Sequence, residues 1–175
     1  TFKTLLTIKD HLSGKFNIKY FKSGSKVFDW TIPPEWNLNY GLMKDENDKI
    51  LIHSKNSNLH IVGYSIPIKQ WFSFEELEPH LFYLKNQKNT IPYVTSYYDK
   101  NWGICLSYND FKKLDKRVKY YVEIDSSFNQ KGKMYYGEWL KKGLIDEEIL
   151  ISTYICHPSM ANNELSGPAV TMELI

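Results

Sequence analysis

Hydrophobic periodicity at the two ends of the chain predicts elements of an α/β domain. Residues 1–12 place apolar side chains at the spacing of an amphipathic helix, and Gly14 is suited to end that helix. Residues 16–21 alternate between apolar and polar side chains, which is typical of a strand with one buried face. Residues 134–140 predict another strand, followed by a turn at residues 141–143.

The C-terminal part of the chain predicts a strand, a polar loop and a helix. Residues 148–156 are almost continuously apolar, as in strands that are covered on both faces. A helix is expected from Gly167 onward, with Ser166 as its N-cap and Pro168 in its first turn. His157 directly follows the predicted strand, at the sheet edge where open α/β sheets collect ligands. This position favours a metal ligand or acid–base group; the alternative is a structural histidine hydrogen-bonded in a loop.

Short strand patterns fill the middle of the chain. The acidic cluster at residues 45–48 predicts a hairpin, and Ser73 with Glu76 fits a capping box that begins a short helix. The remaining patterns predict short strands, at residues 38–43, 49–53, 59–68, 91–98, 102–107 and 118–124. The ends thus predict α/β structure and the middle predicts β structure, as when a β-rich module is inserted into an α/β domain.

The composition is that of a globular protein, with 42% hydrophobic and 24% charged residues. A formal net charge of +2 argues against a nucleic-acid-binding protein, which would carry a concentrated basic surface. The chain has neither an apolar run of the ~18–20 residues that cross a membrane nor a signal-peptide pattern, so a cytoplasmic location is expected. Cys105 and Cys156 lie in apolar runs, which favours reduced thiols. Because the chain begins without Met and stops inside a predicted helix, we expect it to be part of a longer protein.

The adjacent thiol and imidazole of Cys156 and His157 raise the question of a nucleophilic pair. In a strand, successive side chains point to opposite faces, so these two groups are expected to point apart. A Cys–His nucleophile requires the two side chains to be in hydrogen-bond contact. The pair is therefore not expected to act as one.

Four long motifs occur in order along the chain: VFDWTIPPEWN at 27–37, NLHIVGYSIP at 58–67, IPYVTSYYDKNWGICLS at 91–107 and ISTYICHPSMANNELSGP at 151–168. Together they resemble a group of aminopeptidase-like proteins labelled as polysaccharide biosynthesis proteins, which carry an inserted domain of unknown function. The resemblance implies a partial α/β core of the three-layer, mixed-sheet zinc-exopeptidase type at residues 1–23 and 132–175. It implies an inserted β-rich domain at residues 24–131.

The same resemblance implies a zinc site. In zinc aminopeptidases a strand ends in a zinc-binding His, and an Asp in the following Gly-Ala-Asn-Asp-Asn-x-Ser-Gly loop bridges two ions. His157 matches that His, but Asn163 stands in place of the Asp, and Glu164 in place of the next Asn. A neutral amide is a poor bridge, because zinc prefers imidazole, thiolate and carboxylate ligands. We therefore expect one zinc ion on His157, with Glu164 ahead of Asn163 as the second ligand; the alternatives are a two-ion site that uses the Glu164 carboxylate and a site without metal.

The family's general base and remaining ligands are expected beyond Ile175, so residues 1–175 alone are expected to be inactive. Aromatic residues make up 15% of the chain, and most of them are expected to fill the core of the β-rich domain. Others are candidates for a surface that contacts substrate, because aromatic rings stack on sugars and anchor interfaces. These candidates are Trp30, Trp36, Tyr97, Tyr98 and Trp102.

The expected function is zinc-dependent, aminopeptidase-like hydrolysis of an amide bond in a small peptide. One alternative is an amide hydrolase that acts on an amino sugar or glycan precursor in polysaccharide biosynthesis. The other is a non-catalytic module that binds glycan or protein through its aromatic residues. A Glu pair and a late His beyond Ile175 would favour the two enzymes, and their absence would favour the binding module.

Overall fold

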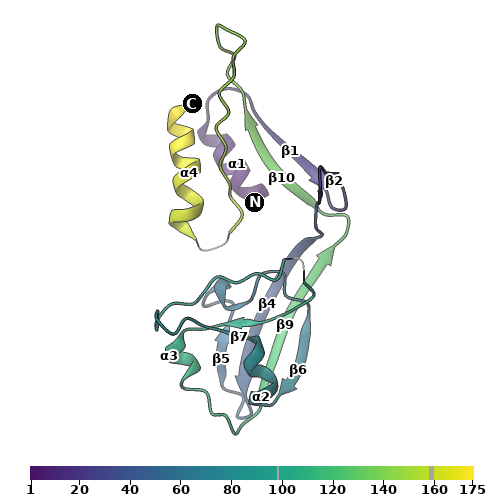
Figure 1. Ribbon diagram of the computed structural model, residues 1–175, viewed down its shortest axis with the longest axis vertical. Coiled ribbons are helices and arrows are strands. Elements are labelled where there is room, and N and C mark those ends of the chain that lie inside the picture. The colour runs from purple at the N-terminus through teal and green to yellow at the C-terminus, as the bar shows by residue number, and fades with distance from the viewer. Residues whose placement is uncertain (98, 158–159) are drawn as a thin grey trace. The chain divides into compact units, whose positions relative to one another are not determined.

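The computed structural model describes residues 1–97, 99–157 and 160–175, which form two compact units (Figure 1). The discontinuous unit contains Thr1–Glu35 and Gln130–Ile175, and the continuous unit contains Trp36–Asn129. The protein is of mixed α/β class, with helices and sheets along the chain. Within the described ranges, no helix has both the length and the apolar character needed to cross a membrane.

The discontinuous unit places a helix against a two-stranded sheet. Helix α1 spans Phe2–His11, and strand β1 (Phe16–Lys22) pairs antiparallel with β10 (Lys133–Trp139) along its whole length. A Cβ atom on Gly137 of β10 would lie 3.0 Å from Cδ2 of Leu5 in α1. Because Gly137 has no side chain, α1 can approach the sheet and bury Leu5.

Two further elements belong to this unit: the hairpin of β2 (Lys26–Val27) with β3 (Trp30–Thr31), and helix α4 (Ala161–Leu174). The predicted start of this last helix is wrong, because Ser166 lies inside α4 and not at its N-cap. Met160 is the N-cap, and its side chain makes no capping hydrogen bond. The residues predicted as a polar loop join the helix instead, and they bring an acidic side chain into its first turn, where the helix dipole favours negative charge.

The apolar segment 148–156 has no regular secondary structure. No described strand pairs with it, so the prediction of a strand here is wrong for this structure (Figure 1). Its side chains are largely exposed, with Ile149 at 92% and Leu150 at 91% of full accessibility. A strand requires partner backbone groups as well as apolar side chains, and the sequence of the segment reports only the side chains.

The continuous unit is built on a four-stranded sheet in the order β5–β4–β9–β6. The strands are β4 (Glu35–Asp45), β5 (Ile50–His53), β6 (Ile68–Phe72) and β9 (Tyr120–Asn129). β4 and β5 form the predicted hairpin, whose turn contains Asp48 at a φ of 60°. β6 and β9 are also antiparallel.

Short elements complete the continuous unit: η1 (Asn58–His60), α2 (Phe74–Leu77), η2 (Glu78–His80), β7 (Leu81–Phe82), β8 (Ile104–Cys105) and α3 (Tyr108–Phe111). The predicted capping box of α2 is confirmed, since Ser73 and Glu76 exchange both hydrogen bonds. The strand predicted at 91–98 is wrong, because residues 91–97 contain only an isolated bridge at Thr95. Aromatic and β-branched residues here pack as irregular structure, which strand propensity does not distinguish.

The core of the continuous unit is apolar and tightly closed. Its most buried members, each at most 1% exposed, come from the sheet and from the elements that cover it: Met43, Leu77, Ile104, Leu106, Val122 and Ile124. Residues that are this completely enclosed make the unit's stability sensitive to loss of a single side chain.

Candidate functional site

His157 and Glu164 meet in the discontinuous unit, at the start of α4. His157 follows the unpaired apolar segment, and Glu164 lies in the first turn of the helix. Glu164 is only 7% exposed, whereas the neighbouring Asn163 is exposed. Of the two candidate partners, the structure thus brings Glu164 to His157 and leaves Asn163 at the surface.

Three polar groups converge at this point. His157 Nδ1 lies 2.6 Å from Glu164 Oε1, and the second carboxylate oxygen accepts a hydrogen bond from the backbone N–H of Cys156. Cys156 Sγ is 3.0 Å from His157 Nδ1 and 3.9 Å from Nε2. The prediction that the Cys156 and His157 side chains point apart is therefore wrong. Alternation applies within a strand, and these residues are not in one.

The surroundings of the site determine the charge of its groups. Burial opposes ionisation of Glu164, but hydrogen bonds from the backbone and side chain of His157 and from the backbone of Cys156 outweigh it and lower the pKa of this carboxyl. Burial, together with the negative charge of Glu164, raises the pKa of the Cys156 thiol. Near neutral pH the site therefore holds a carboxylate and a protonated thiol.

The donor atoms fit a zinc ion by type. One potential ligand atom from each of Cys156, His157 and Glu164 lies within 4.8 Å of the other two. Imidazole nitrogen, sulfur and carboxylate oxygen are the ligands that zinc binds in proteins. Sequence reasoning missed Cys156 as a member of this cluster, because the expected strand alternation had pointed it away.

Two of the aromatic candidates join a cluster in the continuous unit. Trp36 stacks on Tyr64 with ring centroids 5.9 Å apart, and Tyr64 contacts Tyr97 at 4.8 Å. Trp36 Nε1 also donates a hydrogen bond to the backbone oxygen of Ser65 at 2.9 Å. Tyr64 has a φ of 64°, a conformation that bulky residues rarely adopt, and nothing in the sequence marks it.

The other aromatic candidates lie elsewhere. Trp30 is half-buried in β3 of the discontinuous unit. Trp102 is only 6% exposed and stacks on His80 with centroids 3.9 Å apart, so it is a core residue, and the expectation that it lines a substrate surface is wrong. Its large ring fills the core of a small β-rich unit. Tyr98 lies outside the described residues.

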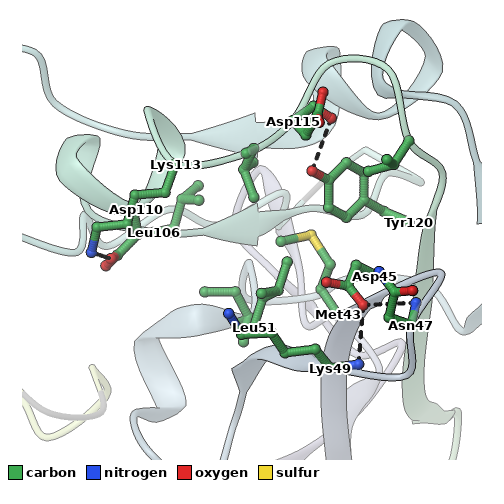
Figure 2. A pocket seen from close by; sticks show the side chains of 13 residues that line it. Met43, Asp45, Asn47, Lys49, Leu51, Leu106, Asp110, Lys113, Asp115 and Tyr120 are labelled. Atoms are coloured by element: carbon green, nitrogen blue, oxygen red, sulfur yellow. Dashed lines mark hydrogen bonds and ion pairs between the residues drawn. The ribbon is translucent and has the colours of Figure 1, made fainter.

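A cavity of about 300 Å³ occurs in the continuous unit, away from these residues (Figure 2). Apolar side chains such as Met43 and Leu106 line it together with carboxylates of Asp45, Asp110 and Asp115. Each carboxylate accepts hydrogen bonds from groups close to it in sequence. The acidic groups therefore stabilise their own turns, and the cavity adds no candidate for the chemistry of the site.

Comparison with known proteins gives concordant matches. Residues 35–127 match a family model described as "Domain of unknown function (DUF2172)". Over 168 residues the chain is 43% identical to a Clostridium acetobutylicum protein named "Putative polysaccharide biosynthesis protein with aminopeptidase-like domain". The alignment covers 96% of this chain and 38% of that protein, so the chain spans well under half of its relative's length.

A solved structure shares the fold. The crystal structure described as that of a "putative peptidase" from Clostridium acetobutylicum matches with a TM-score of 0.90 and 42% sequence identity. The match covers 98% of this chain and 40% of that one. The resemblance carried by the four sequence motifs is thereby confirmed.

Proposed function

Because the chain belongs to the DUF2172 family and its relative is named for an aminopeptidase-like domain, we propose that it is part of a metal-dependent amide hydrolase in which His157 binds zinc. The observation that carries the proposal is the convergence of Cys156, His157 and Glu164, whose ligand-type atoms lie within 4.8 Å of one another. A histidine beside a buried carboxylate is a common arrangement at metal sites. We propose that the discontinuous unit, Thr1–Glu35 and Gln130–Ile175, belongs to a three-layer exopeptidase-type core and that the continuous unit, Trp36–Asn129, is the insertion, which is shorter at both ends than the predicted residues 24–131.

The residues of the cluster have separate tasks in this proposal. His157 supplies an imidazole nitrogen ligand, and Glu164 supplies a negative charge that offsets the charge of the cation. A zinc ion held here would supply a Lewis acid that polarises an amide carbonyl. Catalytic zinc usually has three protein ligands, so the proposal calls for at least one ligand besides His157 and Glu164.

We propose a peptide as the substrate, in line with the names of both relatives. The words "polysaccharide biosynthesis" in one of them support a second candidate, an amino sugar or glycan precursor with an amide bond. The half-buried rings of Trp36, Tyr64 and Tyr97 are compatible with stacking on a sugar. The two candidate substrates differ in the group that flanks the amide bond. Activity on a panel of substrates with different flanking groups therefore distinguishes them.

Metal content of the intact protein tests the proposal. We expect about one zinc per chain in the wild type and loss of that zinc in His157→Ala. His11→Ala is the matched control, because His11 is exposed on α1 and should leave the metal content unchanged. The zinc-loaded protein is then assayed on aminoacyl anilides and on N-acetylated amino sugars. Absence of bound zinc in the wild type, even after incubation with excess metal, would refute the proposal.

A further inference from the structure

The side of the four-stranded sheet that faces away from the core carries polar and aromatic side chains. In this sheet β9 lies between β4 and β6 (Figure 1). Phe72 of β6 is buried in the core, so Trp71 beside it lies on the opposite face, because side chains alternate along a strand. The register of β6 with β9 places Trp71 opposite Tyr121 and Lys69 opposite Glu123. We call the side of the sheet with these four residues the outer face.

A cavity of about 410 Å³ lies on the outer face. Its volume falls in the range of about 300–1,000 Å³ that is typical of small-molecule sites. Lys69, Glu123 and Asp125 supply charged groups to its lining, and Tyr40 and Pro67 each add a ring. The cavity therefore combines fixed polar groups with apolar surface, as binding sites for small polar molecules do.

Glu123 is held in place before any ligand binds. The Tyr40 hydroxyl donates a hydrogen bond to its Oε1 at 2.8 Å, and the Tyr121 hydroxyl donates one to its Oε2 at 3.1 Å. Lys69 Nζ lies 3.1 Å from Oε1, and the glutamate side chain is 17% exposed. The hydrogen bond from Tyr40, with those from Lys69 and Tyr121, outweighs burial and lowers the pKa of this carboxyl. A carboxylate that is already ionised and oriented loses little freedom when it accepts a further hydrogen bond.

The charges in the cavity favour a neutral ligand. Glu123 is paired with Lys69, and Asp125 Oδ2 accepts a hydrogen bond from Asn39 Nδ2 at 3.0 Å. An anionic ligand would meet two carboxylates, and a cationic ligand would have to compete with Lys69 for Glu123. A carboxylate has about four acceptor sites and an ammonium group about three donors, so these contacts leave acceptor capacity on Asp125 and donor capacity on Lys69. Hydroxyl groups, which both donate and accept, match this combination.

Trp71 extends the outer face beyond the cavity. It follows Lys69 by two positions in β6, so the two side chains lie about 7 Å apart along the same face. Its ring is inclined by 55° to that of Tyr121, with centroids 5.4 Å apart. Lys44 Nζ lies 6.0 Å from the Trp71 centroid, yet 45% of this tryptophan remains exposed. An exposed indole is a stacking surface for a ring-shaped ligand.

We propose that the outer face of the continuous unit binds a neutral oligosaccharide, with one sugar ring in the cavity at Glu123 and Asp125 and another on Trp71. Linked sugar rings combine many hydroxyl groups with apolar C–H surfaces, which match the polar cavity and the indole. This site shares no residue with the cluster around His157 and requires no metal. The inference therefore goes beyond the proposed function and stands or fails independently of it.

Oligosaccharide probes that differ in charge test the inference. The affinity of the intact protein is measured by isothermal titration calorimetry with a metal chelator present. The neutral probes are hexamers of glucose, mannose and N-acetylglucosamine, and the cationic probe is the hexamer of glucosamine. We expect a neutral hexamer to bind with a dissociation constant of about 1 mM or below. Binding of the glucosamine hexamer alone would mean that the cavity recognises an amine and would overturn the inference, as would failure of every neutral hexamer to bind.

Single substitutions then locate the binding site. Trp71→Ala should weaken binding of the neutral hexamer by about 10-fold through loss of stacking, and Asp125→Ala by about 5-fold through loss of hydrogen bonds. Tyr93→Ala and Glu75→Ala are the matched controls, because these exposed residues of the same unit lie outside the cavity and should leave the affinity unchanged. Asp125 is exposed, so its substitution tests the site even if loss of Trp71 destabilises the unit. Wild-type affinity in both Trp71→Ala and Asp125→Ala would overturn the inference.

Discussion

Replacing Trp102 by alanine should destabilise the continuous unit, because this ring is part of its core. Trp102 is 6% exposed and lies face to face with His80, with the rings inclined by 13°. The Trp102 ring also contacts Phe72, whose ring centroid is 4.9 Å away. The substitution removes all of these contacts and leaves a space that the surrounding side chains can only partly refill.

The size of the effect follows from the buried area. A tryptophan buries about 150–250 Å², which at about 25 cal/mol per Å² amounts to about 4–6 kcal/mol. Compactness of the unfolded chain reduces this to about 3–5 kcal/mol, in the range measured for Trp→Ala in other cores. Trp71→Ala is the control: its side chain is 45% exposed, so about half of the loss is expected.

Urea unfolding followed by far-ultraviolet circular dichroism compares the free energies of unfolding of wild type, Trp102→Ala and Trp71→Ala. We expect Trp102→Ala to lose the most, by a clear margin. A loss below about 1 kcal/mol for Trp102→Ala would refute the reasoning, because a fully packed tryptophan cannot be removed at so little cost. Combined with weakened substrate binding, that result would restore Trp102 as a candidate for substrate contact.

Two further predictions concern the discontinuous unit and the thiols. Gly167→Ala should lower the free energy of unfolding, measured by urea titration, by about 1–3 kcal/mol, because the new Cβ would lie 2.1 Å from Oγ1 of Thr153. The double variant Gly167→Ala/Thr153→Ala should recover part of this loss, because it lacks the Thr153 hydroxyl. In the native protein near pH 8, iodoacetamide should alkylate Cys156 slowly and Cys105 hardly at all, because burial raises the pKa of Cys105 to about 12 and that of Cys156 by less. Mass spectrometry reads out both sites, and equal labelling of the two before denaturation would contradict the assignment.

Local pattern predicted the elements that depend on few distant partners. The first helix, the hairpin at residues 45–48 and the capping box of Ser73 and Glu76 occur as expected, because each has its signal within a few residues. The segment 148–156 has the side chains of a buried strand but lacks paired neighbours among the described residues. Pairing depends on chain that is distant in sequence, which a local pattern does not report.

For the aromatic residues too, the local sequence predicts less than contacts with distant residues determine. Composition correctly assigned large rings to the core of the β-rich part, yet it could not tell Trp102, which is enclosed, from Trp71, which is half-exposed. Tyr64 contacts Trp36 and Tyr97 from a left-handed backbone conformation. Neither the burial of a given ring nor this backbone conformation follows from residue type.

Helix phase explains why Glu164 and not Asn163 reaches His157. Successive residues of a helix are about 100° apart around its axis, so only one of two neighbours can face a given contact. Gly167, three residues after Glu164, comes so close to Thr153 that a Cβ atom would clash, which marks that side of α4 as the one packed on the segment leading to His157. Glu164 shares this side, and Asn163 points to solvent. The carboxylate at the site is therefore set by where α4 begins and by the glycine that lets it pack, and neither can be read from the loop motif alone.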